Sequence, residues 1–148
     1  MTDEIGQPDG SGPKPLVIFA HSDGFDKLYQ VASIALTAAV SGKPVVVVLF
    51  FWALRAVVGG TADEPVFSAC APGAAEAARR KIATSNNPKP SEMLLMARES
   101  GRLKLFACSA SMQFMDLELE DTRAAVNEVV GMSTILRLSE QAGEVIYI

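Results

Sequence analysis

The chain has 148 residues, of which 49% are hydrophobic and 20% are charged, and its formal net charge is −4. This length and apolar content suit one domain with its own buried core. The slightly negative charge and the absence of basic runs argue against a nucleic-acid partner.

Residues 1–14 are predicted to form a disordered tail, because Gly, Pro, Asp and Ser are common there and apolar periodicity is absent. A single domain is expected over residues 15–148. The start of the chain has no charged-then-apolar signal segment, and the two cysteines, Cys70 and Cys108, are too few for a disulfide framework. A cytoplasmic location is therefore expected.

The first ordered element is predicted at residues 16–20, a continuous apolar run typical of a strand covered on both faces. Apolar residues at helical spacing then predict a helix over 25–40, and a second apolar strand follows at 45–49. A strongly apolar helix is expected over 51–58, where two glycines end it.

The run from 45 to 54 contains about half of the roughly 20 apolar residues that a transmembrane helix needs. No transmembrane segment is therefore predicted. The apolar helix could still lie against a membrane surface or against another subunit, and we favour the subunit, which makes a homo-oligomer the expected state.

Residues 61–90 interrupt the alternation of strand and helix with four prolines, and we interpret them as an insertion with a short helix over 74–83. A segment of this length could be a lid or an oligomer contact, or an ordinary mobile loop. The remaining predicted elements are a helix capped by Ser91 and ended by Gly101, a strand over 103–107, helical segments over 112–117 and 120–126, a strand over 128–130, a helix capped by Ser133, and a last strand over 145–148.

Five buried strands separated by helices predict an α/β protein with three α/β/α layers and a mainly parallel five-stranded sheet. We expect a flavodoxin-like strand order, in which the first and third strands are neighbours. His21 and Cys108 would then emerge side by side at the edge where such sheets bind ligands.

Cys108 follows the third predicted strand and precedes the small-residue turn Ser109-Ala110-Ser111-Met112. Backbone N–H groups and the start of a helix favour an ionised thiol at such a position, so Cys108 is the candidate nucleophile. The alternative is a small buried residue that fills space at the end of a strand. Ser109 and Ser111 could donate hydrogen bonds to the sulfur or to a bound oxyanion, or simply cap a helix.

His21 is the only histidine, and Ser22 and Asp23 follow it directly at the end of the first predicted strand. Its imidazole could polarise the thiol or hold an anion, with Asp23 orienting the ring, or His21 could be a surface residue hydrogen-bonded to Asp23. The N–H groups of Ser22 and Gly24 form a weaker candidate anion site.

Cys70 lies in the insertion, where it could resolve an oxidised Cys108 as a disulfide or be an incidental loop cysteine. His21, Cys70 and Cys108 have no recognised metal-ligand spacing, and the chain has no P-loop or dinucleotide-binding glycine motif. Neither a metal nor a cofactor is therefore expected.

Three stretches resemble the DsrE/DsrF-like family, and specifically its DsrE/DsrF/DrsH-like, peroxiredoxin-like branch. They are residues 50–54 (FFWAL), residues 105–112 (LFACSASM) and the ending from Glu128 to Ile148. The resemblance implies a three-layer α/β protein that assembles into oligomers, and several members of the wider family relay sulfur as a cysteine persulfide. By this resemblance, Cys108 would carry the sulfur.

The leading hypothesis is a sulfur carrier of sulfurtransferase-like function. Cys108 would accept sulfur from a donor protein or a small persulfide and pass it to an acceptor thiol. Two alternatives stay open: a non-catalytic ligand-binding or protein-interaction module in which Cys108 only packs, and a thiol redox enzyme in which Cys70 resolves Cys108.

Overall fold

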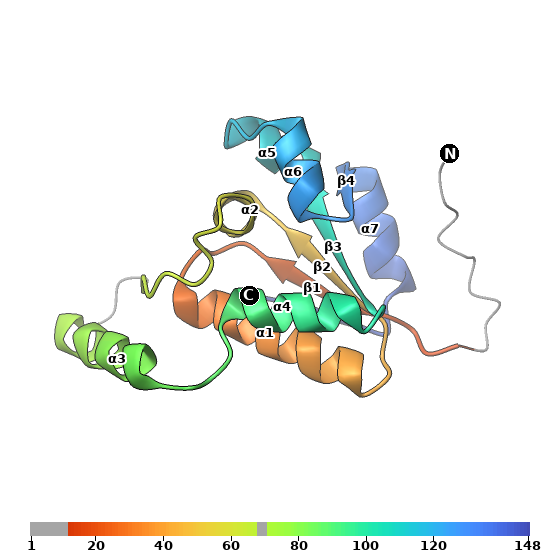
Figure 1. Cartoon of the computed structure of the whole chain (residues 1–148). Coiled ribbons are helices and arrows are strands. Elements are labelled where there is room, and N and C mark those ends of the chain that lie inside the picture. Colours follow the sequence, from red (N-terminus) through yellow and green to blue (C-terminus); the bar gives the residue numbers. More distant parts are fainter. Residues whose placement is uncertain (1–11, 68–70) are drawn as a thin grey trace.

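The computed structural model describes residues 12–67 and 71–148 (Figure 1). In chain order, the elements are β1 (Leu16–Ala20), α1 (Phe25–Val40), β2 (Val45–Leu49), α2 (Phe51–Val58), α3 (Pro72–Thr84), α4 (Pro90–Glu99), β3 (Leu103–Cys108), α5 (Ser109–Phe114), α6 (Leu119–Ala125), β4 (Glu128–Val130), α7 (Met132–Gln141) and β5 (Glu144–Tyr147).

The five strands form one parallel sheet with helices on both faces, which confirms the predicted three-layer α/β/α class. The boundaries of β1, α1, β2 and α2 agree with the prediction because uninterrupted apolar runs and terminal glycines mark them. Helix α5 begins three residues earlier than predicted, directly after Cys108.

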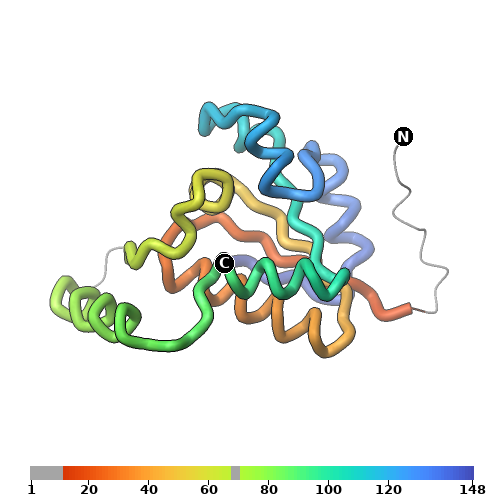
Figure 2. The backbone as a smooth tube through the Cα atoms, in the orientation of Figure 1, coloured from red at the N-terminus to blue at the C-terminus, as the bar shows by residue number. Residues whose placement is uncertain are grey.

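The two faces of the sheet are covered differently. Helices α1 and α4 lie side by side along one face, as the chain trace in Figure 2 shows, and α2 packs into the same apolar cluster. On the opposite face, α7 packs against the sheet through Ile135 and Leu138. The three central strands, β3, β2 and β1, are largely buried because both layers exclude water from the middle of the sheet.

The strand order is β4-β3-β2-β1-β5, so the predicted flavodoxin-like order is wrong. From β1 to β4, each connection moves the chain one strand further in the same direction. Only the connection through α7 returns the chain past β1, to the opposite edge of the sheet. The first and third strands are therefore separated by β2.

Two predicted helix caps also differ from the structure. Helix α4 is preceded by Lys89, whose N–H donates to the Glu92 carboxylate at 2.7 Å, and not by Ser91. Ser91 instead donates its N–H to Asp63 Oδ1 at 2.9 Å and its hydroxyl to Asp63 Oδ2. Helix α7 begins after Gly131 and not after Ser133.

The predicted insertion holds α3, which has no buried residue and lies apart from the helices beside the sheet (Figure 1). The helix predicted within this segment is thus confirmed. Cys70 and most of the predicted N-terminal tail fall outside the described residues. Within residues 12–67 and 71–148, no helix has the length and apolar character needed to cross a membrane.

Candidate cysteine site at the carboxyl edge of the sheet

Cys108 is the last residue of β3, pairs with Val130 of β4, and immediately precedes α5. The segment after β3 packs into the α1 side of the core through Met112 and Val126, whereas α7, which follows β4, lies on the opposite face. The connections after these two neighbouring strands thus part to opposite faces. Open α/β sheets bind ligands beyond the strand ends at such a point.

The Cys108 side chain is buried, with only 2% of the residue exposed. It lies in an apolar cluster on the α7 side of the sheet, whose buried members are Val17, Val46, Val48, Phe106, Cys108, Val130, Ile135 and Leu138. No hydrogen bond to its sulfur is found among the described residues. A nucleophile must be reached by its reaction partner, whereas the Cys108 thiol is closed to solvent here, in the cluster that contains Ile135 and Leu138 of α7.

Ser111 is the unusual polar residue in the helix that follows this cysteine. It is fully buried, and its Oγ has no hydrogen-bond partner among the described residues. Ser111 is the third residue of α5, a position from which a side chain can reach the backbone N–H of the residue before the helix, here Cys108, but Ser111 does not make this bond. An unsatisfied buried hydroxyl costs about 1–3 kcal/mol. The Ser111 hydroxyl therefore lowers the stability of the fold and remains available for a hydrogen bond to a bound group.

The other predicted residues of this turn have different surroundings. Ser109 and Met112 are half-buried, and Ala110 is exposed. Helix α5 has only six residues. Of the four residues after Cys108, only Ser111 therefore brings an unpaired buried polar side chain to the site.

His21 is exposed at the end of β1, where its ring lies 5.7 Å from the ring of Phe51. Because β2 separates β1 from β3, His21 and Cys108 lie two strand spacings apart, about 9.6 Å. The prediction that they emerge from neighbouring strands is therefore wrong. The role of His21 stays a prediction.

The two residues after His21 do not form the expected pair with its ring. Asp23 is exposed, and no hydrogen bond between its carboxylate and the imidazole is found in the described part of the chain. The Ser22 hydroxyl accepts a hydrogen bond from the Gly24 N–H at 3.3 Å. Ser22 thus stabilises the turn into α1.

An apolar cleft of about 510 Å³ opens between α7 and the ends of β1, β2 and β5. Its lining residues are Phe19, His21, Phe50, Met132, Ile135, Leu136, Ser139, Tyr147 and Ile148. Three of them, Phe19, Phe50 and Ile135, also pack in the apolar cluster that contains Cys108. We take Phe50 and Ile135 as the wall between this cleft and the cysteine, because Phe50 follows β2, the neighbour of β3, whereas Phe19 lies on β1, two strands from Cys108.

This cleft was not predicted from the sequence, although the residue pattern of α7 contains a signal of it. Met132 and Leu136 are four residues apart and therefore share one face of the helix. They lie beside the core residues Ile135 and Leu138, yet both are more than half exposed. The apolar stripe of α7 is thus wider than its contact with the sheet requires.

The turn from β2 into α2 has a strained residue. Phe51 has a φ of +37°, a value that side-chain-bearing residues rarely adopt. Its ring stacks on Phe114 of α5, with 6.2 Å between the ring centroids. Such strain costs about 1–3 kcal/mol and occurs often at functional sites. The strained turn adjoins Phe50, the wall residue of the cleft.

No metal centre is evident in the described ranges: they contain no group of three or more His, Cys, Asp or Glu side chains that could hold a metal ion. The disulfide partner proposed for Cys108, Cys70, lies outside those ranges. The structure therefore gives no geometry for the redox alternative.

Comparison with known proteins gives information on the fold. No family model matches the chain, and no curated protein matches it. One similar solved structure is a conserved protein of unknown function from Bacteroides thetaiotaomicron, with a TM-score of 0.58, 16% identity, and coverage of 91% of this chain and 95% of the other. Another is a protein of unknown function from Methanobacterium thermoautotrophicum, with a TM-score of 0.54, 13% identity, and coverage of 91% and 99%. At these identities the similarity establishes the fold alone.

Proposed function

We propose that this protein is a sulfur carrier in which Cys108 holds a persulfide within the end of the sheet. The observation that carries the proposal is the position of Cys108 at the end of β3, where the connections that follow β3 and β4 run to opposite faces of the sheet. Three residues later in the chain, Ser111 has a buried hydroxyl without a partner among the described residues. The resemblance of residues 105–112 to the DsrE/DsrF-like family supports the same role.

The transfer is an exchange of sulfur without net oxidation. Cys108 loses its proton, and its sulfur attacks the outer sulfur of a donor persulfide, R–S–SH. The S–S bond of the donor breaks as a new S–S bond forms on Cys108, and the donor leaves as a thiolate that takes up the proton. The products are Cys108–S–SH and R–SH, and attack by an acceptor thiol repeats the exchange.

The buried position of Cys108 sets a condition for this chemistry. The donor sulfur must approach through the wall formed by Phe50 and Ile135, since both residues contact the apolar cleft and the cysteine cluster. A partly buried aromatic ring at the surface end of a strand can change its rotamer far faster than the fold opens. When the ring returns, it shields the persulfide from other thiols, and the hydroxyl of Ser111 is free to donate to it.

The proposal keeps the partners and location expected from the sequence. Donor and acceptor are proteins or small molecules that carry thiols or persulfides, the compartment is the reducing cytoplasm, and the carrier works as a homo-oligomer. No cofactor takes part in the exchange.

The test is site-resolved mass spectrometry of the full chain after incubation with a small persulfide donor. We expect an added mass of about 32 Da on the peptide that contains Cys108. The Cys108→Ala variant should stay unmodified, and Cys70 in the same protein is the internal control. Equal modification of Cys70 and Cys108, or no modification, would contradict the proposal.

A second function is favoured by one observation: the cleft beside His21 is open while Cys108 is buried. The protein could then be a non-catalytic module that binds an apolar ligand, with Cys108 as a packing residue. In that case Cys108→Ala would bind an apolar fluorescent probe as wild type does, and the persulfide experiment would give no added mass.

A further inference from the structure

Strand β5 forms one edge of the sheet, and the layer on its α7 side is incomplete. Five strands span about 19 Å at 4.8 Å per spacing, whereas one helix with its side chains is about 10–12 Å wide. Helix α7 packs in one cluster with residues of β1 to β4, and among the described residues it leaves a partly uncovered strip over β5 and the end of β1, where Phe19 and Val145 are half-buried. On this strip, Phe19 lies 4.9 Å from the ring of Tyr147, which is 75% exposed.

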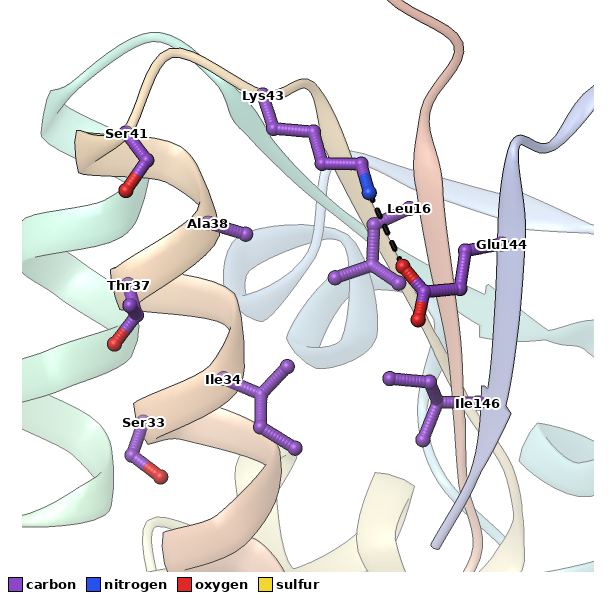
Figure 3. Close-up of a pocket in the computed structure, with 9 residues that line it drawn as sticks. All are labelled: Leu16, Ser33, Ile34, Thr37, Ala38, Ser41, Lys43, Glu144 and Ile146. Atoms are coloured by element: carbon purple, nitrogen blue, oxygen red, sulfur yellow. Dashed lines mark hydrogen bonds and ion pairs between the residues drawn. The ribbon is translucent and has the colours of Figure 1, made fainter.

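The opposite side of β5 is also hollow. Figure 3 shows Leu16, Ile34 and Ile146 around an open pocket between α1 and β5. An ion pair between Lys43 Nζ and Glu144 Oε2, at 3.1 Å, lies at one end of this pocket. The outer edge of β5, which has no strand partner within residues 12–67 and 71–148, is therefore flanked by apolar surface on both faces.

The backbone of β5 turns two residues toward this free edge. The Ile148 N–H donates to the Phe19 carbonyl at 2.9 Å, and the Ile148 carbonyl accepts from the His21 N–H at 3.0 Å. Ile148 thus directs both polar groups toward β1. Since this direction alternates along a parallel strand, Ile146 also faces β1, whereas Val145 and Tyr147 direct their N–H and C=O groups outward.

We propose that a second copy of this chain pairs with β5 in antiparallel orientation, about a twofold axis that passes beside Ile146. Val145 of each copy then faces Tyr147 of the other, and the two residues exchange two hydrogen bonds. The symmetric pair gives four such bonds, and the two sheets join into one of ten strands. Strand addition at a free edge is a common mode of protein recognition.

Self-complementarity favours a second copy over a different partner. The residues with outward-facing polar groups are two positions apart, which is the spacing that a twofold antiparallel pair requires. Val145 and Tyr147 also lie on the same face, so each Tyr147 ring covers the Val145 of the other copy on the incomplete strip. The one charged residue of β5, Glu144, is at its end and is already paired with Lys43. No like charges meet at the axis.

The test compares wild type with Tyr147→Pro and Tyr147→Thr by sedimentation and by hydrogen exchange of the full chain. Proline removes an outward-facing N–H and no hydrogen bond to β1, so the monomer should keep its circular dichroism spectrum. Threonine removes the ring but keeps the N–H. We expect twice the monomer mass for wild type, the monomer mass for Tyr147→Pro, and a weaker dimer for Tyr147→Thr.

In the wild-type dimer, the amides of Val145 and Tyr147 should exchange slowly, and in the Tyr147→Pro monomer the Val145 amide should exchange fast. The Ile146 amide should stay protected in both because it bonds to β1. If wild type sediments as a monomer at all concentrations, the proposal is overturned, and any partner of the β5 edge is a different molecule. A dimer in which the Val145 and Tyr147 amides exchange freely would also overturn it. Neither result depends on whether Cys108 carries sulfur.

Discussion

At the scale of single residues, Cys108 combines a position typical of reactive cysteines with an apolar, buried environment. Its place at the end of β3 could be predicted because an apolar run stops there and small residues follow. Its burial depends on Ile135 and Leu138, which reach it from a helix more than twenty residues later in the chain. The residues that surround a strand end cannot be identified before the strand order is known.

Phe50 is the residue whose removal should expose the cysteine. We expect Phe50→Ala to raise the rate of Cys108 alkylation under native conditions by about tenfold, since tenfold corresponds to only about 1.4 kcal/mol. Phe19→Ala is the matched control, because Phe19 borders the same cleft and cluster but lies on β1, two strands from Cys108. An equal increase of the Cys108 alkylation rate in both variants would indicate general loosening of the core. It would contradict the role of Phe50 as the residue that separates the cleft from Cys108.

Removal of the Ser111 hydroxyl should raise the stability of the protein and weaken its function. Ser111→Ala removes a buried hydroxyl without a partner, so the free energy of unfolding should rise by about 1 kcal/mol. The same variant should lose persulfide from Cys108 faster than wild type, because the free donor is gone. Urea denaturation measures the first effect, and mass spectrometry over time measures the second. A loss of stability would mean that the hydroxyl is satisfied in solution.

At the scale of elements, strands and helices were predictable where one residue pattern dominates. The continuous valines of β2 and the apolar periodicity of α1 fix both elements, and the structure has them at the predicted residues. Helix starts were less predictable because their partners are distant. Ser91 has the residue type of a cap, yet its N–H and hydroxyl bind Asp63, 28 residues earlier.

The contact between Asp63 and Ser91 predicts a measurable loss of stability. Asp63→Ala removes both hydrogen bonds at the start of α4 and should lower the free energy of unfolding by about 1 kcal/mol, the usual cost of a lost helix cap. Glu64→Ala changes a neighbouring exposed carboxylate and should stay within about 0.5 kcal/mol of wild type. Urea denaturation compares the two. Equal effects would show that charge, and not the cap, determines the change.

At the scale of the whole molecule, the order of the strands decides which residues meet. Apolar strands of similar composition do not encode their neighbours, so the three-layer class was predictable and the order was not. The observed order separates His21 from Cys108 and brings Cys108 beside Val130. It also makes β5 an edge strand, and the proposed dimer follows from that position.

The most direct test of the sulfur-carrier proposal is the intact mass of the native protein through one cycle of loading and release. With a persulfide donor, the account predicts a gain of about 32 Da per chain, and with an excess of acceptor thiol, a return to the original mass as the acceptor becomes the persulfide. A protein that gains no sulfur while Cys108 remains a free thiol would contradict it, and so would one that gains the sulfur on Cys70.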